Sequence, residues 1–255
     1  MGEYMVGWLY QALRRGIVTT RYPAEPPTAE EGPTSSHAPE ARPGGGADLV
    51  QGKEVCPTGA IGPEGVRQGA CIRCARCTAA KFELHGPVDL TSRSAKGLIW
   101  PEGISPKEET EKPPRLHRLP RSLHVFLVDV GSCNGCNLEC TALSNPYYDS
   151  QRLGIFFTNS PRHADVLLVV GIPTEELIPA LLRAHEAMPA PKAVVAAGAC
   201  ALEGGIFLGQ KGTRGPLDAI LPVDIYVPGC PPTPVAILRG ILEVRRRLAV
   251  PGGGR

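Results

Sequence analysis

The sequence lacks several features that would assign it to common classes of protein. It has no apolar run long enough to span a bilayer, so we expect no membrane-spanning helix. The formal net charge is only +2 and aromatic residues make up 5%, so no nucleic-acid-binding surface is indicated. The N-terminal MGEYMVGWLYQALRRG places its apolar stretch before its arginines, the reverse of a secretory signal peptide. We therefore expect the nine cysteines to lie in a reducing compartment, where metal or redox use is commoner than disulfides.

Glycine and proline, in contrast, are abundant, at 30 and 27 residues of 255. Residues 22–47 are rich in Pro, Ala, Ser, Glu and Gly, and residues 101–121 are rich in Pro and charge, so both are interpreted as linkers. Residues 1–21 precede them as an amphipathic helix and a leading segment. The linkers set apart a small cysteine-rich segment, 48–100, from a larger domain, 122–250.

The larger domain alternates apolar strands with amphipathic helices. Such alternation, with elements of these lengths, predicts an α/β fold with a flavodoxin-like, doubly wound, mostly parallel sheet. Thr174 is a candidate N-cap of the helix TEELIPALLRAHEAM, and Pro234 is acceptable in the first turn of the last helix. The predicted strands are LHVFLVDV, GIFFT, DVLLVVG, KAVVAAG and DIYVPG.

Cysteines follow three of these strands. Cys133 and Cys136 come after LHVFLVDV, Cys200 after KAVVAAG and Cys230 after the last strand. In an open α/β sheet the ligand crevice lies beyond the carboxyl ends of the strands, so these side chains are expected to meet on one rim. Four thiolates on one rim can hold a tetrahedral metal or a 4Fe–4S cluster.

A second group of cysteines lies in the small segment. Cys71, Cys74 and Cys77 form C-x2-C-x2-C, and Cys56 is followed by proline. The pattern is that of a bacterial two-cluster ferredoxin from which one complete ligand set has been lost. We therefore predict one 4Fe–4S cluster on these four cysteines, with a structural zinc site as the alternative. The positions where the second ligand set would lie are Gly46, Leu49, Gly52 and Lys81.

The N-terminal half resembles the ferredoxin-like subunits of respiratory complex I and of related membrane-bound hydrogenases. The resemblance rests on LYQALRRGIVTTRYP, CPTGAI and CIRCARC, and covers about residues 5–22 and 54–85. It implies a small ferredoxin-like α+β segment in front of the larger domain.

The larger domain resembles the small subunit of NiFe hydrogenases and its complex I homologue, the 20 kDa B subunit. Four segments agree in order over residues 123–248: DVGSCNGCNLE, TNSPRHADVLLVVG, AVVAAGAC and VPGCPPTP. The resemblance implies that Cys133, Cys136, Cys200 and Cys230 bind the cluster that faces the large subunit. Complex I subunits have adjacent cysteines at the first position, whereas here two residues separate Cys133 from Cys136. This spacing favours the energy-converting, formate-hydrogenlyase type (group 4) of hydrogenase.

The resemblance implies an electron-transfer subunit with two 4Fe–4S clusters in a membrane-associated oxidoreductase. Its implied partners are a NiFe-hydrogenase or complex I-type large subunit, membrane subunits of the same complex, and a redox donor protein or formate dehydrogenase-type module. The implied location is peripheral, on the cytoplasmic face of the cell membrane. The alternatives are a complex I-like subunit that binds and reduces quinone, and a zinc-stabilised interaction module.

Several further residues are of interest beside the cysteine sets. Glu139 follows the second cysteine of its loop by three positions, and is either a proton relay or a first-turn glutamate favoured by the helix dipole. Cys140 is interpreted as a small buried apolar residue. His163 is expected to make structural or large-subunit contacts rather than to bind metal. Arg245, Arg246 and Arg247 are expected to form a solvated helix face or to bind an acidic partner.

Overall fold

In a computed structural model of the chain, the described residues are 10–11, 13–16, 19–23, 40–43, 46–85, 91–100 and 122–248. Most of the predicted N-terminal helix and of both linkers therefore lies outside the described residues. No helix in the described ranges is long and apolar enough to cross a membrane.

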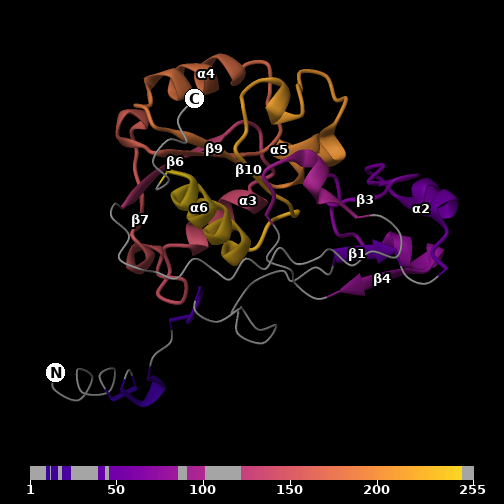
Figure 1. The fold of residues 1–255 in the computed structure, drawn as a ribbon, viewed down its shortest axis with the longest axis horizontal. Coiled ribbons are helices and arrows are strands. Elements are labelled where there is room, and N and C mark those ends of the chain that lie inside the picture. Colours follow the sequence, from indigo (N-terminus) through magenta and orange to yellow (C-terminus); the bar gives the residue numbers. More distant parts are fainter. Residues whose placement is uncertain are drawn as a thin grey trace, which may run out of the picture.

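The larger domain is built on a five-stranded sheet in which all neighbouring strands are parallel (Figure 1). Its order is β10-β9-β8-β6-β7. Numbered along this domain, the order is 2-1-3-4-5, that of flavodoxin-like folds, which confirms the predicted doubly wound parallel sheet. The strands are β6 (Leu123–Asp129), β7 (Ile155–Phe157), β8 (Val166–Val170), β9 (Ala193–Ala197) and β10 (Ile225–Val227).

Helices cover both faces of this sheet. All five residues of β8 are buried, and its alternate side chains enter two separate cores. Val166, Leu168 and Val170 join the core under α3 and α6, whereas Leu167 and Val169 join the core under α4 and α5. Successive side chains of a strand point to opposite faces of the sheet, and both faces are covered here. The strand is therefore apolar at every position. The helices are α3 (Gly135–Ala142), α4 (Ile178–Ala187), α5 (Ala199–Glu203) and α6 (Pro234–Leu248), with short 3-10 turns η3 (Ser150–Leu153), η4 (Pro161–His163), η5 (Gly205–Phe207) and η6 (Leu217–Ala219).

Helix α6 begins at Pro234, as predicted, but α4 begins at Ile178 and Thr174 is not its N-cap. Thr174 forms an isolated antiparallel bridge with Thr213, and the backbone N–H of Glu175 donates to the carbonyl of Gly212 at 2.9 Å. These contacts hold the backbone away from the helix, so the helix starts only after them.

Arg245 is buried, with 5% of its surface exposed, so the prediction of a solvated face is wrong for this residue. Its guanidinium donates to the carbonyls of Leu153 and Gly154, at 2.8 and 3.1 Å. It thus satisfies backbone acceptors at the end of η3, and burial lowers its pKa. The side chains of Arg246 and Arg247 lie outside the described residues.

The smaller part contains two small sheets, β1-β4 and β2-β3-β5, with the pairings antiparallel. Strand β1 lies inside the predicted 22–47 linker, so the prediction that this stretch has no fold is wrong for residues 40–43. Ala41 pairs with Leu84 and Pro43 with Phe82, and β1 is an edge strand that tolerates a terminal proline. The elements are β1 (Glu40–Pro43), α2 (Leu49–Val55), β2 (Ile61–Gly62), β3 (Gly65–Arg67), η1 (Arg76–Ala80), β4 (Phe82–His85), η2 (Ala95–Leu98) and β5 (Ile99–Trp100).

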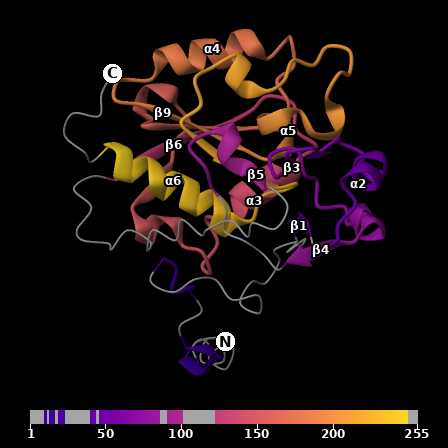
Figure 2. The same cartoon turned by 45° about the vertical axis from the view of Figure 1, so that its right-hand side comes forward.

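The two parts of the chain are docked on each other (Figure 2). Ser92 pairs with the edge strand β10, donating to and accepting from the backbone of Tyr226 at 3.0 and 2.7 Å. Leu98, 1% exposed, belongs to the core under α4 and α5. On the other face, Tyr22 is buried in the core under α6, and Arg152 donates to its carbonyl at 3.2 Å. The segments on either side of the small domain are therefore anchored to the larger one.

Candidate iron–sulfur sites

The first group of cysteines lines one pocket in the smaller part. Cys56 follows α2 directly, Cys71 and Cys74 lie in the loop after β3, and Cys77 lies in η1. All four border the same pocket. The loop turns sharply because Arg73 and Ala75 adopt left-handed conformations, with φ of 56° and 63°. The structure thus brings together the cysteines that the motif singled out.

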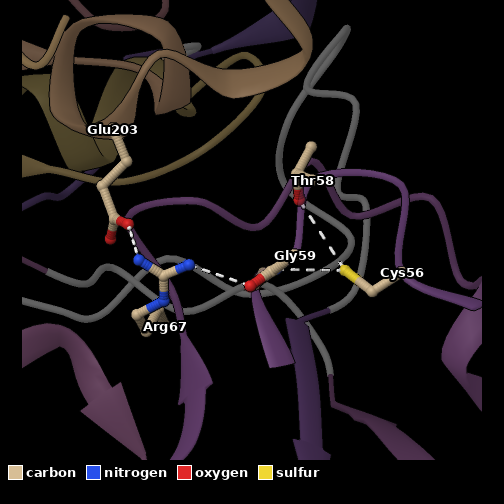
Figure 3. Close-up of polar contacts among 6 residues, drawn as sticks. Cys56, Thr58, Gly59, Arg67 and Glu203 are labelled. Carbon is tan, nitrogen blue, oxygen red and sulfur yellow. Dashed lines mark hydrogen bonds and ion pairs between the residues drawn. The ribbon is translucent and has the colours of Figure 1, made fainter. Parts of the chain in front are cut away.

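Backbone groups point at two of these sulfurs. The N–H of Ala60 donates to Cys56 Sγ at 3.3 Å, and the N–H of Arg73 donates to Cys71 Sγ at 3.4 Å. Thr58 Oγ1 lies 3.7 Å from Cys56 Sγ (Figure 3). Donors of this kind stabilise thiolate sulfur, and they are one of the means by which proteins set cluster potentials.

The second group lies at the carboxyl ends of the strands of the large sheet. Cys133 and Cys136 follow β6, Cys200 lies in α5 after β9, and Cys230 follows β10. The sheet order reverses between β6 and β8, which is where α/β sheets place their ligand crevice. The strand-to-helix turn at Gly198 has φ of +96°, and a Cβ there would lie 2.7 Å from Cys136 Sγ. Only glycine allows this close approach of backbone to thiol.

Burial and the charges of neighbouring thiols shift the pKa values in both groups of cysteines. Burial, followed by the charges of Cys71, Cys74 and Cys56, raises the pKa of Cys77 to about 11. Burial also raises the pKa of Cys136, and the charges of Cys140, Cys200, Cys230 and Cys133 add to the shift. Thiolates that repel one another in a buried site need a cation to stabilise them, and a bound metal deprotonates its thiol ligands outright. Both donor sets therefore fit a cationic, thiolate-ligated cluster.

Among the described residues, no three His, Cys, Asp or Glu side chains converge as ligands of one metal ion would. A cluster of four irons and four sulfides requires no such convergence, because each of its four cysteines binds a different iron. All nine cysteines lie in the described ranges, and none forms a disulfide.

A polar network holds the loop that carries Cys133. Asp129, the last residue of β6, accepts hydrogen bonds from the backbone of Gly131 and Ser132 at 2.9 and 2.8 Å. Its second carboxylate oxygen accepts from the Ser132 hydroxyl at 2.7 Å and from the Asn137 side chain. Although partial burial opposes the shift, these donors hold the pKa of Asp129 below its ordinary value of 3.8.

Comparison with known proteins places this arrangement in a family. Residues 133–244 match the family model of the NADH ubiquinone oxidoreductase 20 Kd subunit. The "Probable membrane-bound hydrogenase subunit mbhJ" of Pyrococcus furiosus is 47% identical over 129 residues, which cover 51% of this chain and 77% of that protein. The chain belongs to this 20 Kd subunit family.

Other members of the family are similar over shorter shares of their length. Formate hydrogenlyase subunit 7 of Escherichia coli is 42% identical over 151 residues, and the match spans 59% of each protein. An NADH-quinone oxidoreductase subunit of Citrifermentans bemidjiense is 43% identical over 114 residues, covering 45% of this chain and 66% of that protein. These relatives are subunits of oxidoreductases. The family match starts at residue 133, so the ferredoxin-like resemblance of the N-terminal half stays a prediction.

Three further residues of this family member were named from the sequence. Cys140 is 2% exposed and packs in the core under α6, where burial and then the charge of Glu139 raise its pKa to about 12. Glu139 lies in the second turn of α3, so the first-turn dipole explanation is wrong; burial raises its pKa. His163 is exposed on η4, before β8, at the end of the sheet opposite the cysteines.

Sequence reasoning missed the charged residues between the two sites. Arg67 donates to Glu203 at 2.6 Å, across 136 residues of sequence. Arg73, 8% exposed, lies inside the first cysteine motif, and its charge opposes the burial and the Cys133 charge that raise the pKa of Cys230. The Arg67–Glu203 pair brings β3 of the smaller part against α5, the helix that carries Cys200. The only sequence signal was an arginine inside a cysteine motif, which does not reveal its partner.

Proposed function

We propose that this chain is an iron–sulfur electron-transfer subunit of a membrane-associated, hydrogenase-type oxidoreductase. The proposal is supported by two groups of four cysteines in a single docked unit: the first group lines one pocket, and the second follows strands that end on one rim of the large sheet. The first site would be held by Cys56, Cys71, Cys74 and Cys77, and the second by Cys133, Cys136, Cys200 and Cys230. Clusters bound there would supply one-electron redox chemistry.

The protein's own contribution at each site is to place the thiols and limit contact with water. Cys71, Cys77, Cys136 and Cys200 are each at most 9% exposed. The backbone donors to Cys56 and Cys71 stabilise charge on those sulfurs. Asp129 accepts hydrogen bonds from Ser132 and Asn137 and so fixes the loop before Cys136, although Asp129 is not itself a ligand.

Exposed apolar side chains close in sequence to cysteines of the second set support a large-subunit partner. Leu138 of α3 is 64% exposed, and Ile206 and Leu208, which follow α5, are 53% and 57% exposed. Both helices carry cysteines of the second set, so a partner that covers these side chains would lie beside that site. We assign the covering of these side chains to a NiFe-hydrogenase-type or complex I-type large subunit. Membrane subunits and a redox donor or formate dehydrogenase-type module would complete the complex, on the cytoplasmic face of the membrane.

The spacing of the first two cysteines of the second set favours the formate-hydrogenlyase type. Asn134 and Gly135 separate them, and Asn134 adopts a left-handed conformation with φ of 74°, which turns the chain into α3. The identity to an NADH-quinone oxidoreductase subunit keeps quinone reduction as a second candidate. Intact cysteine pairs in the large subunit, with hydrogen-dependent reduction of the assembled complex, would decide for the hydrogenase.

Metal and sulfide analysis of anaerobically purified chain tests the proposal. We expect about eight irons and a matching amount of acid-labile sulfide per chain, the content of two 4Fe–4S clusters. Zinc without acid-labile sulfide would show instead a structural metal module and would overturn the proposal.

A further inference from the structure

One guanidinium connects the surroundings of the two cysteine sites. Arg67, at the end of β3, donates through Nη1 to Glu203 Oε2 at 2.6 Å and through Nη2 to the carbonyl of Gly59 at 2.8 Å (Figure 3). Its planar fork presents donors in two directions at fixed geometry, which a lysine ammonium does not do.

The two acceptors belong to the two sites. Gly59 lies in the turn between Cys56 and Ala60, the residue whose N–H donates to Cys56 Sγ. Glu203 is the last residue of α5, and Cys200 lies in the same short helix. Arg67 is thus hydrogen-bonded to the backbone beside one ligand set and to the helix that carries part of the other.

The contact is closely packed. The Arg67 and Glu203 side chains are 36% and 20% exposed, and a Cβ on Gly69 would lie 2.8 Å from Glu203 Oε1. A partly buried carboxylate is costly unless it is paired, and Arg67 supplies the pairing. The pair therefore ties β3 of the small part to α5 of the larger one.

We propose that Arg67 is a positioning residue that fixes the two cysteine sites relative to each other and so sets the electron exchange between them. The inference rests on the proposed function, because it requires a cluster at each site. In that exchange one site is oxidised by one electron and the other is reduced by it, and no proton or atom moves. Because electron tunnelling weakens steeply with separation, a small change in docking has a large effect.

A second ion pair between the same two parts provides a matched control. Arg93 donates through Nε to Glu243 Oε1 at 3.1 Å, joining the segment before η2 to α6. Its side chain is 65% exposed, and α6 carries no cysteine. Removal of this arginine changes the net charge equally and breaks a contact between the same parts, but it touches neither ligand loop.

The test measures the magnetic interaction between the two reduced clusters by pulsed electron paramagnetic resonance on the full, cluster-loaded chain. We expect Arg67→Met to retain its iron but to lose the single defined interaction of the wild type. Arg67→Lys should recover it only in part, and Arg93→Met should match the wild type. After rapid reduction of one site, the rate of equilibration with the other should fall several-fold in Arg67→Met alone.

An unchanged interaction in iron-replete Arg67→Met would overturn the proposal, as would an equal change in Arg93→Met. If Arg67→Met loses iron, the same measurement is made on Glu203→Ala instead. Its control is Glu203→Gln, whose side-chain oxygen can still accept a hydrogen bond from Arg67. If Glu203→Ala also loses iron, the ion pair is needed for the clusters to bind at all, and the positioning role is overturned. Absence of a second cluster in the wild type would instead contradict the proposed function.

Discussion

At the scale of single residues, we interpret Cys140 as a buried cysteine that is not a cluster ligand, in contrast to its neighbour Cys136. It lies one turn after Cys136 on α3 and packs in the core under α6, and four other cysteines already follow the strands that end at the second site. We predict that Cys140→Ala keeps the full iron content and costs about 1 kcal/mol of stability. Cys136→Ala should lose about four irons. Iron loss in the Cys140 variant, measured against protein concentration, would show that the ligand assignment is wrong.

Glu203 gives a second residue-scale prediction. Burial raises its pKa above the ordinary 4.5, with Asp218 and Glu64 adding to the shift and Arg67 opposing it. The folded state therefore holds this proton more tightly than the unfolded state. Its stabilising contribution is complete below pH 4.5 and is lost as the pH rises through the folded-state pKa.

Glu203→Gln lacks this dependence, so its melting temperature should rise relative to the wild type as the pH is raised, and then level off. Thermal melts of both proteins from weakly acidic to neutral pH would measure the difference. A difference that moves in the opposite direction would mean that the Arg67 ion pair outweighs the cost of burial.

At the scale of elements, the strands of the large domain could be predicted because their signal is local. β8 is apolar at every position since both of its faces are covered, and the cysteines follow the strands that place them. The misplaced start of α4 and the missed strand β1 have non-local causes. Thr174 is held by Thr213, and β1 exists because it pairs with β4, about forty residues along the chain.

The turn from β9 into α5 gives an element-scale prediction. Gly198→Ala would place a Cβ 2.7 Å from Cys136 Sγ at a φ of +96°, so the thiol must move. We expect this variant to lose about four irons, those of the second site. Gly209→Ala is the matched control, because it has φ of +80° and nothing within 4 Å of its Cβ. Both variants also strain a backbone with positive φ, and Gly198, with ψ of 149°, lies in a region essentially restricted to glycine. Equal iron loss in the two would attribute the effect to backbone strain.

At the scale of the whole molecule, the sequence indicated two parts but not that they dock on each other. The cysteine spacings identified both ligand sets, whereas the contacts between the parts join residues that are far apart: Arg67 with Glu203, Ser92 with Tyr226, and Arg93 with Glu243. Arg67, Ser92 and Arg93 are polar residues of ordinary surface type. Nothing in their local pattern reveals a partner more than a hundred positions away, so only the folded chain shows that the two sites belong to one body.

Because the two parts dock on each other, we predict that they stay associated when the chain between them is cut. A protease site introduced within residues 101–121 should yield two fragments that still elute together, because Ser92 pairs with β10 and Leu98 is buried beside α5. Burial of Leu98 alone contributes about 2 kcal/mol. Leu98→Asp would bury an unpaired charge and should release the fragments after cleavage. Leu177→Asp, at a leucine that is 40% exposed, is the control and should leave them together. Separation of the cleaved wild type in size-exclusion chromatography would show that the covalent connection, rather than the interface, holds the two sites in place.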